Sequence, residues 1–331
     1  MIVPVLLFLL GLLCLIKGGD WFVDGATGIA RRFHIPEIIV GATVVSIGTT
    51  LPEVMVSATS AVMGHGEIAY GNAIGSVICN TALIAALTLA VHPGPVDRKS
   101  FRTPVTFFFI AAAFYILNAY LFGGFARWSG IVLLLVFAVY MILTVRQGLA
   151  GAGNDGPDAE GKNPDDKETE PVRAHPLWLD LVLLVAGAAL IAIGADLLVD
   201  NGTKIAQALG VPESVIALTF VALGTSLPEL VTAITSLAKG HGALSLGNVV
   251  GANLFNLVLV SGLSITLNPF SLPAGKTVAG MNASLVVDVP VMLVVMWILT
   301  IPALITGKMK RWQGITLLAI YAAFCVFQFV A

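Results

Sequence analysis

The sequence predicts an all-α membrane protein with ten transmembrane helices in two inverted five-helix repeats. Three observations lead to this fold class. The composition is too apolar for a soluble domain, ten apolar segments have membrane-spanning length, and the motifs of the first half return in the second at a constant offset of 176 residues.

The composition excludes an ordinary soluble domain. Hydrophobic residues make up 57% of the 331 residues, charged residues only 11%, and the mean hydropathy is +0.95. Soluble domains carry about 25% charged residues. The three cysteines lie within apolar runs, which is typical of buried thiols and not of disulfide frameworks or zinc sites. The net charge of −2 carries no information on partners, and nothing in the chain points to a nucleic acid.

Apolar runs of about 20 residues can cross a hydrocarbon core about 30 Å thick. Ten of them follow one another, at 3–25, 37–63, 67–91, 103–122, 128–149, 176–200, 212–238, 243–267, 282–305 and 312–330. The first has no basic region before it and no small-residue cleavage site, so we interpret it as a retained span and not as a signal peptide. The runs define a first repeat at 1–149 and a second at 176–331. The acidic, Gly- and Pro-rich segment 150–175 is expected to be a disordered linker.

The distribution of Lys and Arg predicts the orientation. With the N-terminus outside, thirteen basic residues fall on inside segments and three on outside loops. The positive-inside rule then places both termini outside, on the periplasmic side, and the linker in the cytoplasm. The expected location is the cell inner (plasma) membrane, as a multi-pass protein.

The repeat is the strongest feature of the sequence. GTTLPE at 48–53 returns as GTSLPE at 224–229, and GNAIG at 71–75 returns as GNVVG at 247–251. Asp20 and Asp24 return as Asp196 and Asp200. Because one copy holds five spans, an odd number, the second copy must enter the membrane in the opposite direction. Inverted repeats are typical of alternating-access transporters, whose binding sites lie near the midplane where the repeats meet.

Two glutamates, Glu53 and Glu229, fall in the middle of predicted spans, and an ionisable group at that depth usually marks an ion path. A protonated glutamate that only packs the bundle is the simpler alternative, which its recurrence in both halves disfavours. Hydroxyl residues three and four positions earlier share the helix face of each glutamate. They are Thr49 and Thr50 in the first copy and Thr225 and Ser226 in the second.

Each motif also contains a proline, Pro52 or Pro228, which is expected to kink the helix and to free main-chain carbonyls for coordination. The candidate carbonyls are those of Ser46 and Ala222. A packing kink without a ligand role is the alternative.

The following span of each copy offers further oxygens. Ser76 and Asn80 lie on one helix face, and the second copy has Ala252 and Asn256 at these positions. The asparagines either coordinate an ion or form hydrogen bonds between helices. Carboxylate, hydroxyl, amide and carbonyl oxygens together are ligands of Ca²⁺ and Na⁺ and not of soft metals. Four glycines at small-xxx-small spacing are expected to let these helices approach closely: Gly71, Gly75, Gly247 and Gly251.

With these motifs the sequence resembles the calcium/cation antiporter superfamily, in its bacterial sodium/calcium exchanger branch, over essentially the whole chain. The resemblance implies a diamond-shaped core of the second, third, seventh and eighth spans, over which the first and sixth slide. It also implies cation ligands at the matching positions: Thr49, Thr50, Glu53, Ser76, Asn80, Thr225, Ser226, Glu229 and Asn256. An archaeal branch of known structure has an acid in place of Asn256 and a serine in place of Ala252. The missing hydroxyl is expected to weaken or reshape one sodium site.

The expected function is therefore antiport of Na⁺ against Ca²⁺ and not catalysis. Two ionised glutamates balance one Ca²⁺ or two Na⁺, and the third Na⁺ of the family's usual exchange would make the cycle electrogenic. The first alternative is a Ca²⁺/H⁺ exchanger that uses the same glutamates, and a second is a non-transporting membrane scaffold or sensor. No cofactor is implied. The expected partners are Ca²⁺ and Na⁺, with H⁺ as the alternative coupling ion, and the lipid bilayer; the oligomeric state is not fixed by the sequence.

Overall fold

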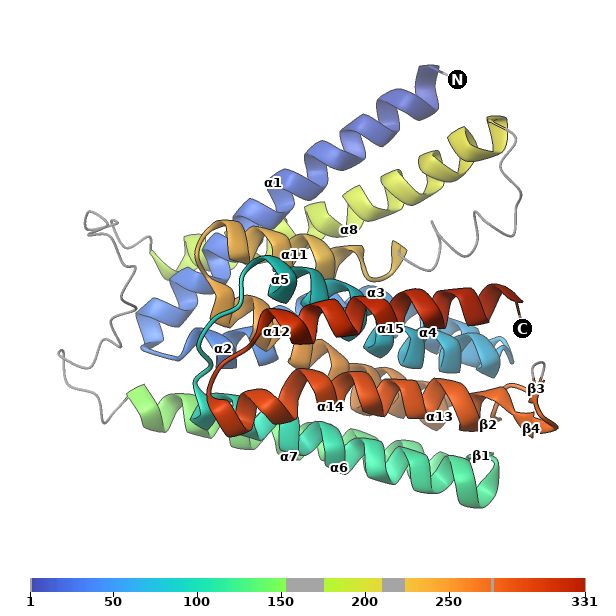
Figure 1. Ribbon diagram of the computed structural model, residues 1–331. Helices are drawn as coiled ribbons and strands as arrows, with labels where there is room; N and C mark the ends of the chain where they lie inside the picture. The colour runs from blue at the N-terminus through green and yellow to red at the C-terminus, as the bar shows by residue number, and fades with distance from the viewer. Residues whose placement is uncertain (1, 153–175, 210–223, 275–276, 331) are drawn as a thin grey trace.

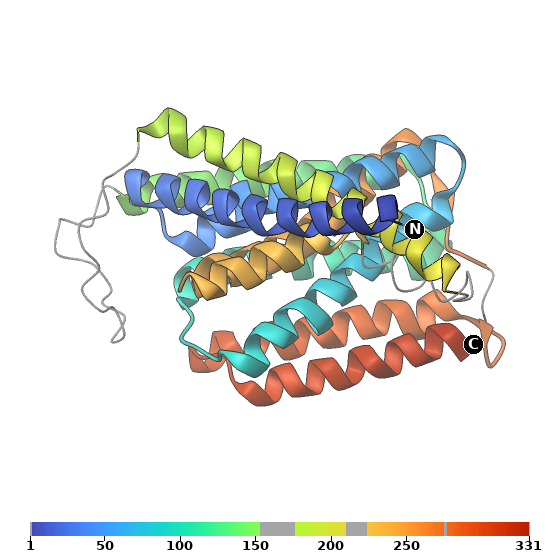
Figure 2. The same ribbon diagram turned by 90° about the horizontal axis from the view of Figure 1, so that it is seen from above.

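The protein is a bundle of helices (Figures 1 and 2). The structure is a computed structural model that describes residues 2–152, 176–209, 224–274 and 277–330. In the first half the elements, with π-helical segments named η, are α1 (Ile2–Phe33), α2 (Glu37–Val40), η1 (Gly41–Val45), α3 (Ser46–Val62), α4 (Gly66–Cys79), η2 (Asn80–Ala85), α5 (Ala86–Val91), α6 (Arg98–Phe122), β1 (Gly124–Phe125) and α7 (Arg127–Ala152).

The second half repeats the order of long helices. Its described elements are α8 (Leu177–Ala208), α11 (Leu227–Ala238), α12 (Gly242–Phe255), η4 (Asn256–Val260), α13 (Ser261–Leu267), β2 (Phe270–Ser271), β3 (Thr277–Val278), β4 (Met281–Asn282), η5 (Ser284–Asp288), α14 (Val289–Thr306) and α15 (Arg311–Val330). The strands are short antiparallel pairs: β1 pairs with β2, and β3 with β4.

Every predicted span coincides with helix in the part of the chain that the structure describes. Eight helical segments there are long and apolar enough to cross a membrane. Of the predicted span 212–238, only α11 and the turn before it lie among the described residues. The prediction of ten crossings therefore remains a prediction. α7 continues to Ala152, so the linker starts at least three residues later than expected, and 153–175 lie outside the described residues.

Local signals explain where the helices begin and end. The Asp97 carboxylate caps α6 by accepting hydrogen bonds from the backbone N–H groups of Lys99 and Ser100, at 3.0 and 3.2 Å. Gly123 ends the helix with φ 63°, a left-handed conformation that favours glycine. Gly307 ends α14 in the same way, with φ 70°.

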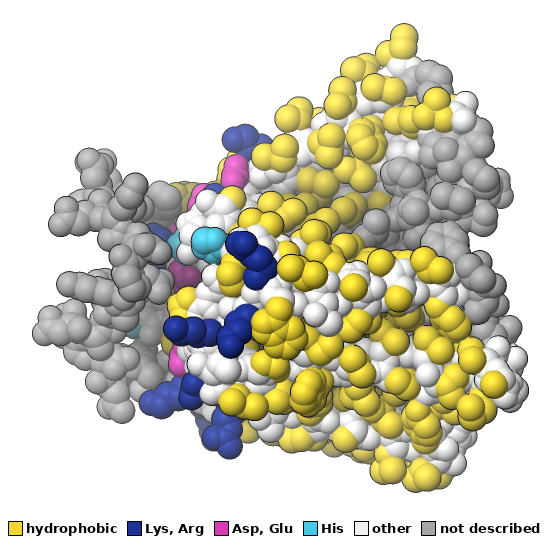
Figure 3. Space-filling view, viewed as in Figure 1, with side chains coloured by type: hydrophobic (Ala, Val, Ile, Leu, Met, Phe, Trp, Pro, Cys, Tyr) yellow, Lys and Arg dark blue, Asp and Glu magenta, His cyan; other side chains and the backbone are white. Residues whose placement is uncertain are grey.

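The outer surface of the bundle is apolar. Side chains such as Leu13 on α1, Leu135 on α7 and Val185 on α8 are more than half exposed. Figure 3 shows a face covered largely by hydrophobic side chains, with Lys and Arg gathered at one end. Such a surface requires an apolar solvent. The chain is therefore a membrane protein with several apolar helices.

α1 and α8 lie side by side and antiparallel, as a pair that crosses over the rest of the bundle (Figures 1 and 2). Glycines at seven-residue spacing bring their backbones together. A Cβ added to Gly18 would lie 2.9 Å from the carbonyl oxygen of Gly187, and one added to Gly11 would lie 2.9 Å from that of Gly194. The other side of the pair contacts α3 and α11.

Candidate ion-binding site

Four helices meet at the centre of the bundle: α3 and α4 from the first half, and α11 and α12 from the second. Glu53 comes from α3 and Glu229 from the first turn of α11, and both are fully buried, with 0% exposure. The two carboxylates are close enough to interact electrostatically. Residues 176 positions apart in the sequence are thus brought into one buried place.

No protein group forms a hydrogen bond with either carboxylate oxygen of Glu53 or Glu229, among the residues that the structure describes. The hydroxyls of Thr49 and Thr50 approach Glu229 without a well-aligned hydrogen bond to it. Buried polar groups nearly always have partners, and a buried unpaired carboxylate is costly. Four orphaned carboxylate oxygens at one place therefore fit a cation as their partner.

Neutral side-chain oxygens on the same helices, and on the π-helical segments that follow α4 and α12, also lack hydrogen-bond partners. Thr50 Oγ1, Asn80 Oδ1, Ser226 Oγ and Asn256 Oδ1 are buried and have no hydrogen-bond partner among the described residues. The Asn256 amide nitrogen donates to the Ala252 carbonyl at 3.0 Å, which leaves its oxygen as the free end. Carboxylate, hydroxyl and amide oxygens form the ligand set that hard cations prefer.

The remaining predicted ligands differ from these. Ser76 is buried on α4, one turn before Asn80. Thr49 and Thr225 both use their hydroxyls: Thr49 donates to Asn248 Oδ1 at 3.2 Å, and Thr225 to Asn72 Oδ1 at 3.3 Å. Their side chains are therefore engaged in protein contacts.

Of the two predicted carbonyl ligands, Ser46 lies among the described residues. Ser46 is fully buried at the start of α3, and its hydroxyl donates to the carbonyl of Gly41 at 2.7 Å. A role of its own carbonyl as a ligand remains a prediction. Ala222 lies outside the described residues.

The asparagines sit where the helices change their winding. α4 gives way to the π-helical segment η2 at Asn80, and α12 gives way to η4 at Asn256, again 176 residues later. Short π-helical segments occur often at functional sites. The turns before α4 and α12 also match, because Gly64 and Gly240 have left-handed φ values of 86° and 84°.

The kink expected at the two prolines remains a prediction, but the helix bounds around the two prolines differ. Pro52 lies within α3, which runs as one helix from Ser46 to Val62. Pro228 lies in the first turn of α11, where a proline needs no N–H partner, and Thr225 and Ser226 form a turn before it. The same residue therefore sits inside a helix in one copy and at a helix start in the other.

The close helix approach expected at the four motif glycines is found in the second copy and not in the first. A Cβ on Gly247 would lie 2.3 Å from the Ile38 carbonyl oxygen, and one on Gly251 would lie 2.3 Å from Ser46 Oγ. A Cβ on Gly71 or Gly75 would meet no atom within 4 Å. Only α12 is packed against the α2–α3 backbone so closely that glycine is required.

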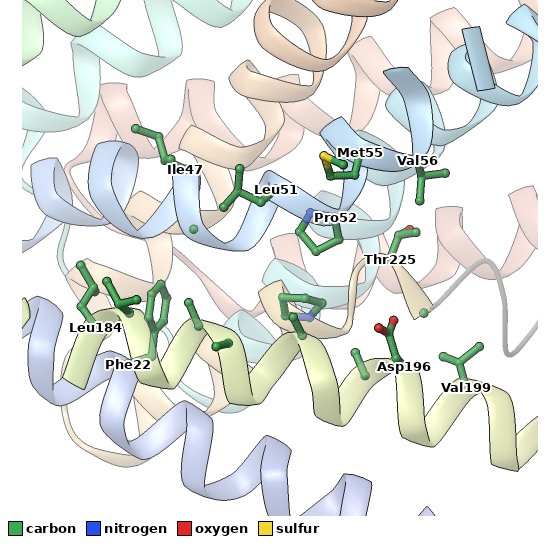
Figure 4. Close-up of a pocket in the computed structure, with 18 of the residues that line it drawn as sticks. Phe22, Ile47, Leu51, Pro52, Met55, Val56, Leu184, Asp196, Val199 and Thr225 are labelled. Carbon is green, nitrogen blue, oxygen red and sulfur yellow. The ribbon is translucent and has the colours of Figure 1, made fainter. Parts of the chain in front are cut away.

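A cavity of about 860 Å³ runs between α3 and α8 and reaches the second copy's motif at Thr225 and Pro228. Its walls are mostly apolar, formed by side chains such as Leu51, Met55 and Val199. Figure 4 shows Asp196 on α8 and Thr225 across from it at the same end of the cavity. Its lining includes Pro52 and Pro228, the residues directly before Glu53 and Glu229, but neither glutamate.

The repeated aspartates have different surroundings in the two copies. Asp24 of α1 forms an ion pair with Lys239 at 2.8 Å, and Asp20 lies 3.5 Å from the same ammonium group. Their counterparts, Asp196 and Asp200, line the cavity.

Sequence reasoning missed Asn72 and Asn248 as part of this region. Both stand in the quoted GNAIG and GNVVG motifs, which was the available signal, but their partners lie in the opposite half of the chain.

The chain matches known transporters along nearly its whole length. The family model of the sodium/calcium exchanger protein matches residues 3–146 and 179–330. Sodium/calcium exchanger MaX1 of Methanosarcina acetivorans is 33% identical over 351 residues, which cover 98% of both chains. An uncharacterized membrane protein of Methanocaldococcus jannaschii is 36% identical over 323 residues, covering 95% of this chain and 94% of that one.

A solved structure of the sodium-calcium exchanger NCX_Mj matches the fold with a TM-score of 0.77 and 34% identity, and the match covers 97% of both chains. The two relatives whose names state an activity, MaX1 and NCX_Mj, are exchangers and not enzymes. Both the motifs and the full-length matches lead to one assignment: the chain belongs to the sodium/calcium exchanger family.

Proposed function

We propose that the protein exchanges Na⁺ for Ca²⁺ across the membrane by alternating access, with Glu53 and Glu229 as the central ligands. One observation carries the proposal: two fully buried carboxylates from opposite halves interact, and none of their oxygens has a hydrogen-bond partner among the described residues. Membership of the exchanger family supports the choice of ions.

The charge count makes the two ions competitors. Two ionised glutamates carry −2, which one Ca²⁺ or two Na⁺ neutralise. A third Na⁺ would rest on neutral oxygens such as those of Thr50, Asn80 and Ser226, and the cycle would then move net charge. A site that holds unbalanced buried charge is costly to carry past apolar walls. Loaded sites are therefore expected to move and empty ones to stay, which gives exchange instead of leak.

We further propose that the halves are inverted repeats that together cross the membrane ten times. The identical bounds of α4 and α12 at the offset of 176 support this, as do the paired π-helical segments and the matching glycine turns. Each half as predicted holds an odd number of spans, so the second runs in the opposite direction.

The proposed location is the inner (plasma) membrane, with both termini outside and residues 153–175 in the cytoplasm. The clustering of Lys and Arg at one end of the bundle supports this orientation (Figure 3). The N- and C-termini lie toward the other end (Figure 1).

The test is calcium flux in reconstituted vesicles with Na⁺, H⁺ and K⁺ gradients imposed separately. Wild-type protein is expected to take up calcium when a sodium gradient is imposed, and Glu53→Gln and Glu229→Gln are each expected to reduce this uptake at least tenfold. Glu67→Gln is the matched control, because Glu67 is an exposed glutamate at the start of α4. Full sodium-driven uptake by Glu53→Gln would refute the ligand assignment, and uptake driven by a pH gradient without sodium would favour proton exchange.

A further inference from the structure

Asn72 and Asn248, the asparagines of the two GN motifs, make reciprocal contacts between the halves of the chain. The Thr225 hydroxyl donates to Asn72 Oδ1 at 3.3 Å, and the Thr49 hydroxyl donates to Asn248 Oδ1 at 3.2 Å. The two asparagines are 176 positions apart, as are the two threonines. Each motif therefore holds the threonine of the opposite copy, in the same way and at nearly the same distance.

Asn72 also holds its own copy's glutamate helix. Its amide nitrogen lies 2.8 Å from Ser57 Oγ and 3.2 Å from the main-chain carbonyl of Glu53, to both of which it donates. Both ends of the amide are thus used, one on each half of the chain. Asn72 is therefore engaged in protein contacts on both halves, while its Oδ1 keeps a second lone pair. It joins the turn that carries Thr225 to the helix that carries Glu53.

Asn248 repeats this role with one difference. Its Oδ1 accepts from Thr49 and lies 3.3 Å from Ser46 Oγ, so it fixes the start of α3. Its amide nitrogen has no partner among the described residues, and the position equivalent to Ser57 is Ala233. The contact that is conserved between the copies is therefore the one with the opposite copy's threonine.

The place of the asparagines on their helices links them to the ion site. Asn72 and Ser76 on α4 are followed at the same four-residue spacing by Asn80, the first residue of η2. Asn248 and Ala252 on α12 are followed in the same way by Asn256, the first residue of η4. Each stripe thus begins with an asparagine that bonds to protein and ends with one whose oxygen is free.

We infer that Asn72 and Asn248 are positioning residues, which form two latches that hold the ion-binding turn of each half in register with the other half. The inference rests on the proposed function, because the groups that the latches align are the proposed ligands. Asn72 fixes Glu53 and the Thr225 turn that leads to Glu229, while Asn248 fixes Thr49 one turn before Glu53. Opening a latch lets the two carboxylates drift apart and lowers cation affinity.

The experiment is a double-mutant cycle on one latch in full-length protein. Asn72→Ala and Thr225→Val are each expected to raise the half-saturating Ca²⁺ concentration about tenfold, because each leaves a partly buried polar partner unpaired. The double variant is expected to show about the same tenfold change and not the product of the two. The maximal rate at saturating Ca²⁺ is expected to change much less, which separates positioning from lost chemistry. Thr225→Ser, which keeps the hydroxyl, is expected to recover most of the affinity that Thr225→Val loses.

Asn118→Ala is the matched control. Asn118 is buried in α6 and donates to the Phe114 carbonyl of its own helix, away from the site. Its removal is expected to leave the half-saturating Ca²⁺ concentration unchanged. The same double-mutant cycle can be run on the second latch with Asn248→Ala and Thr49→Val. It tests the inference if Asn72→Ala does not fold.

The inference is overturned if the effects of Asn72→Ala and Thr225→Val multiply to about a hundredfold, or if Asn72→Ala behaves like Asn118→Ala. Wild-type vesicles without sodium-driven calcium uptake would instead overturn the proposed function. In that case the same cycle, measured on thermal unfolding in detergent, still decides whether Asn72 and Thr225 are coupled.

Discussion

The contact between α1 and α8 leads to a prediction whose size can be worked out from the structure. A Cβ on Gly187 of α8 would lie 2.4 Å from the backbone nitrogen of Phe22, 2.7 Å from its Cα and 2.8 Å from the carbonyl oxygen of Gly18. All three atoms belong to the backbone of α1, so no side chain can turn away. Favourable contacts between such atoms begin at about 3.5 Å. Gly187→Ala therefore pushes the helices apart locally by about 1 Å, the difference between 3.5 and 2.4 Å.

The free-energy cost follows from this displacement. Overpacking of a close contact costs about 1–3 kcal/mol. The greater helix propensity of alanine returns up to about 1 kcal/mol. We expect a net loss of about 1 kcal/mol for Gly187→Ala. The measurement is the thermal unfolding temperature of purified protein in detergent, which is expected to fall.

The control for this prediction is Gly71→Ala, which has the same change of residue in another apolar helix. Gly71 is exposed on α4, and a Cβ there would meet no atom within 4 Å. Its unfolding temperature is expected to equal or exceed that of the wild type, because only the propensity term remains. If Gly187→Ala proved as stable as Gly71→Ala, α1 and α8 would not be packed as closely as the structure has them, and the reasoning would be refuted.

Three further predictions concern single contacts. Tyr140→Phe removes the buried hydrogen bond of 2.8 Å from the Tyr140 hydroxyl to the Ala42 carbonyl in η1. This change is expected to cost about 1–3 kcal/mol in the free energy of unfolding. Tyr120→Phe, at an exposed tyrosine whose hydroxyl donates to the Leu285 carbonyl, should cost less. Ala252→Ser places on α12 the hydroxyl that Ser76 supplies on α4. The half-saturating Na⁺ concentration for sodium-driven calcium flux is expected to fall. An unchanged value would show that position 252 lies away from the sodium path. Lys239→Met introduces the residue found at the equivalent position, Met63, and removes the ion pairs with Asp20 and Asp24. Because these groups are partly exposed, stability should change by less than about 1 kcal/mol, while hydrogen exchange of α1 around Asp20 and Asp24 should become faster.

The helices could be predicted closely because membrane spans follow from a simple physical rule. An apolar run of the required length must form a helix in lipid, where every backbone group needs an internal partner. The π-helical segments could not be predicted in the same way. They widen a helix by one residue per turn without changing its composition, so η2 and η4 read in the sequence as ordinary helix.

The burial of the two glutamates could be predicted, because a charged residue within an apolar run is conspicuous in the sequence. A glutamate such as Glu53 in the middle of an apolar run stands out, and its recurrence as Glu229 removes the alternative of chance. Packing could not be predicted, because it depends on partners distant in the chain. Gly71 and Gly247 stand in the same motif, yet only Gly247 meets a backbone, that of Ile38. The latches join residues 153 and 199 positions apart, and no local pattern shows which side chains will meet at such separations.

The differences between the two copies are as informative as their likeness. Equivalent residues have unlike surroundings: Pro52 lies inside α3 while Pro228 starts α11, and Asp24 is paired with Lys239 while Asp200 lines the cavity. Under the proposed alternating access, the opposite-facing state arises when the copies exchange these conformations. The pairing of Asp24 with Lys239 cannot be exchanged, because Lys239 has Met63 as its counterpart. We therefore expect the ion pair to favour the state seen here by less than about 1 kcal/mol, a factor of about five in population, and Lys239→Met to shift the balance toward the opposite state.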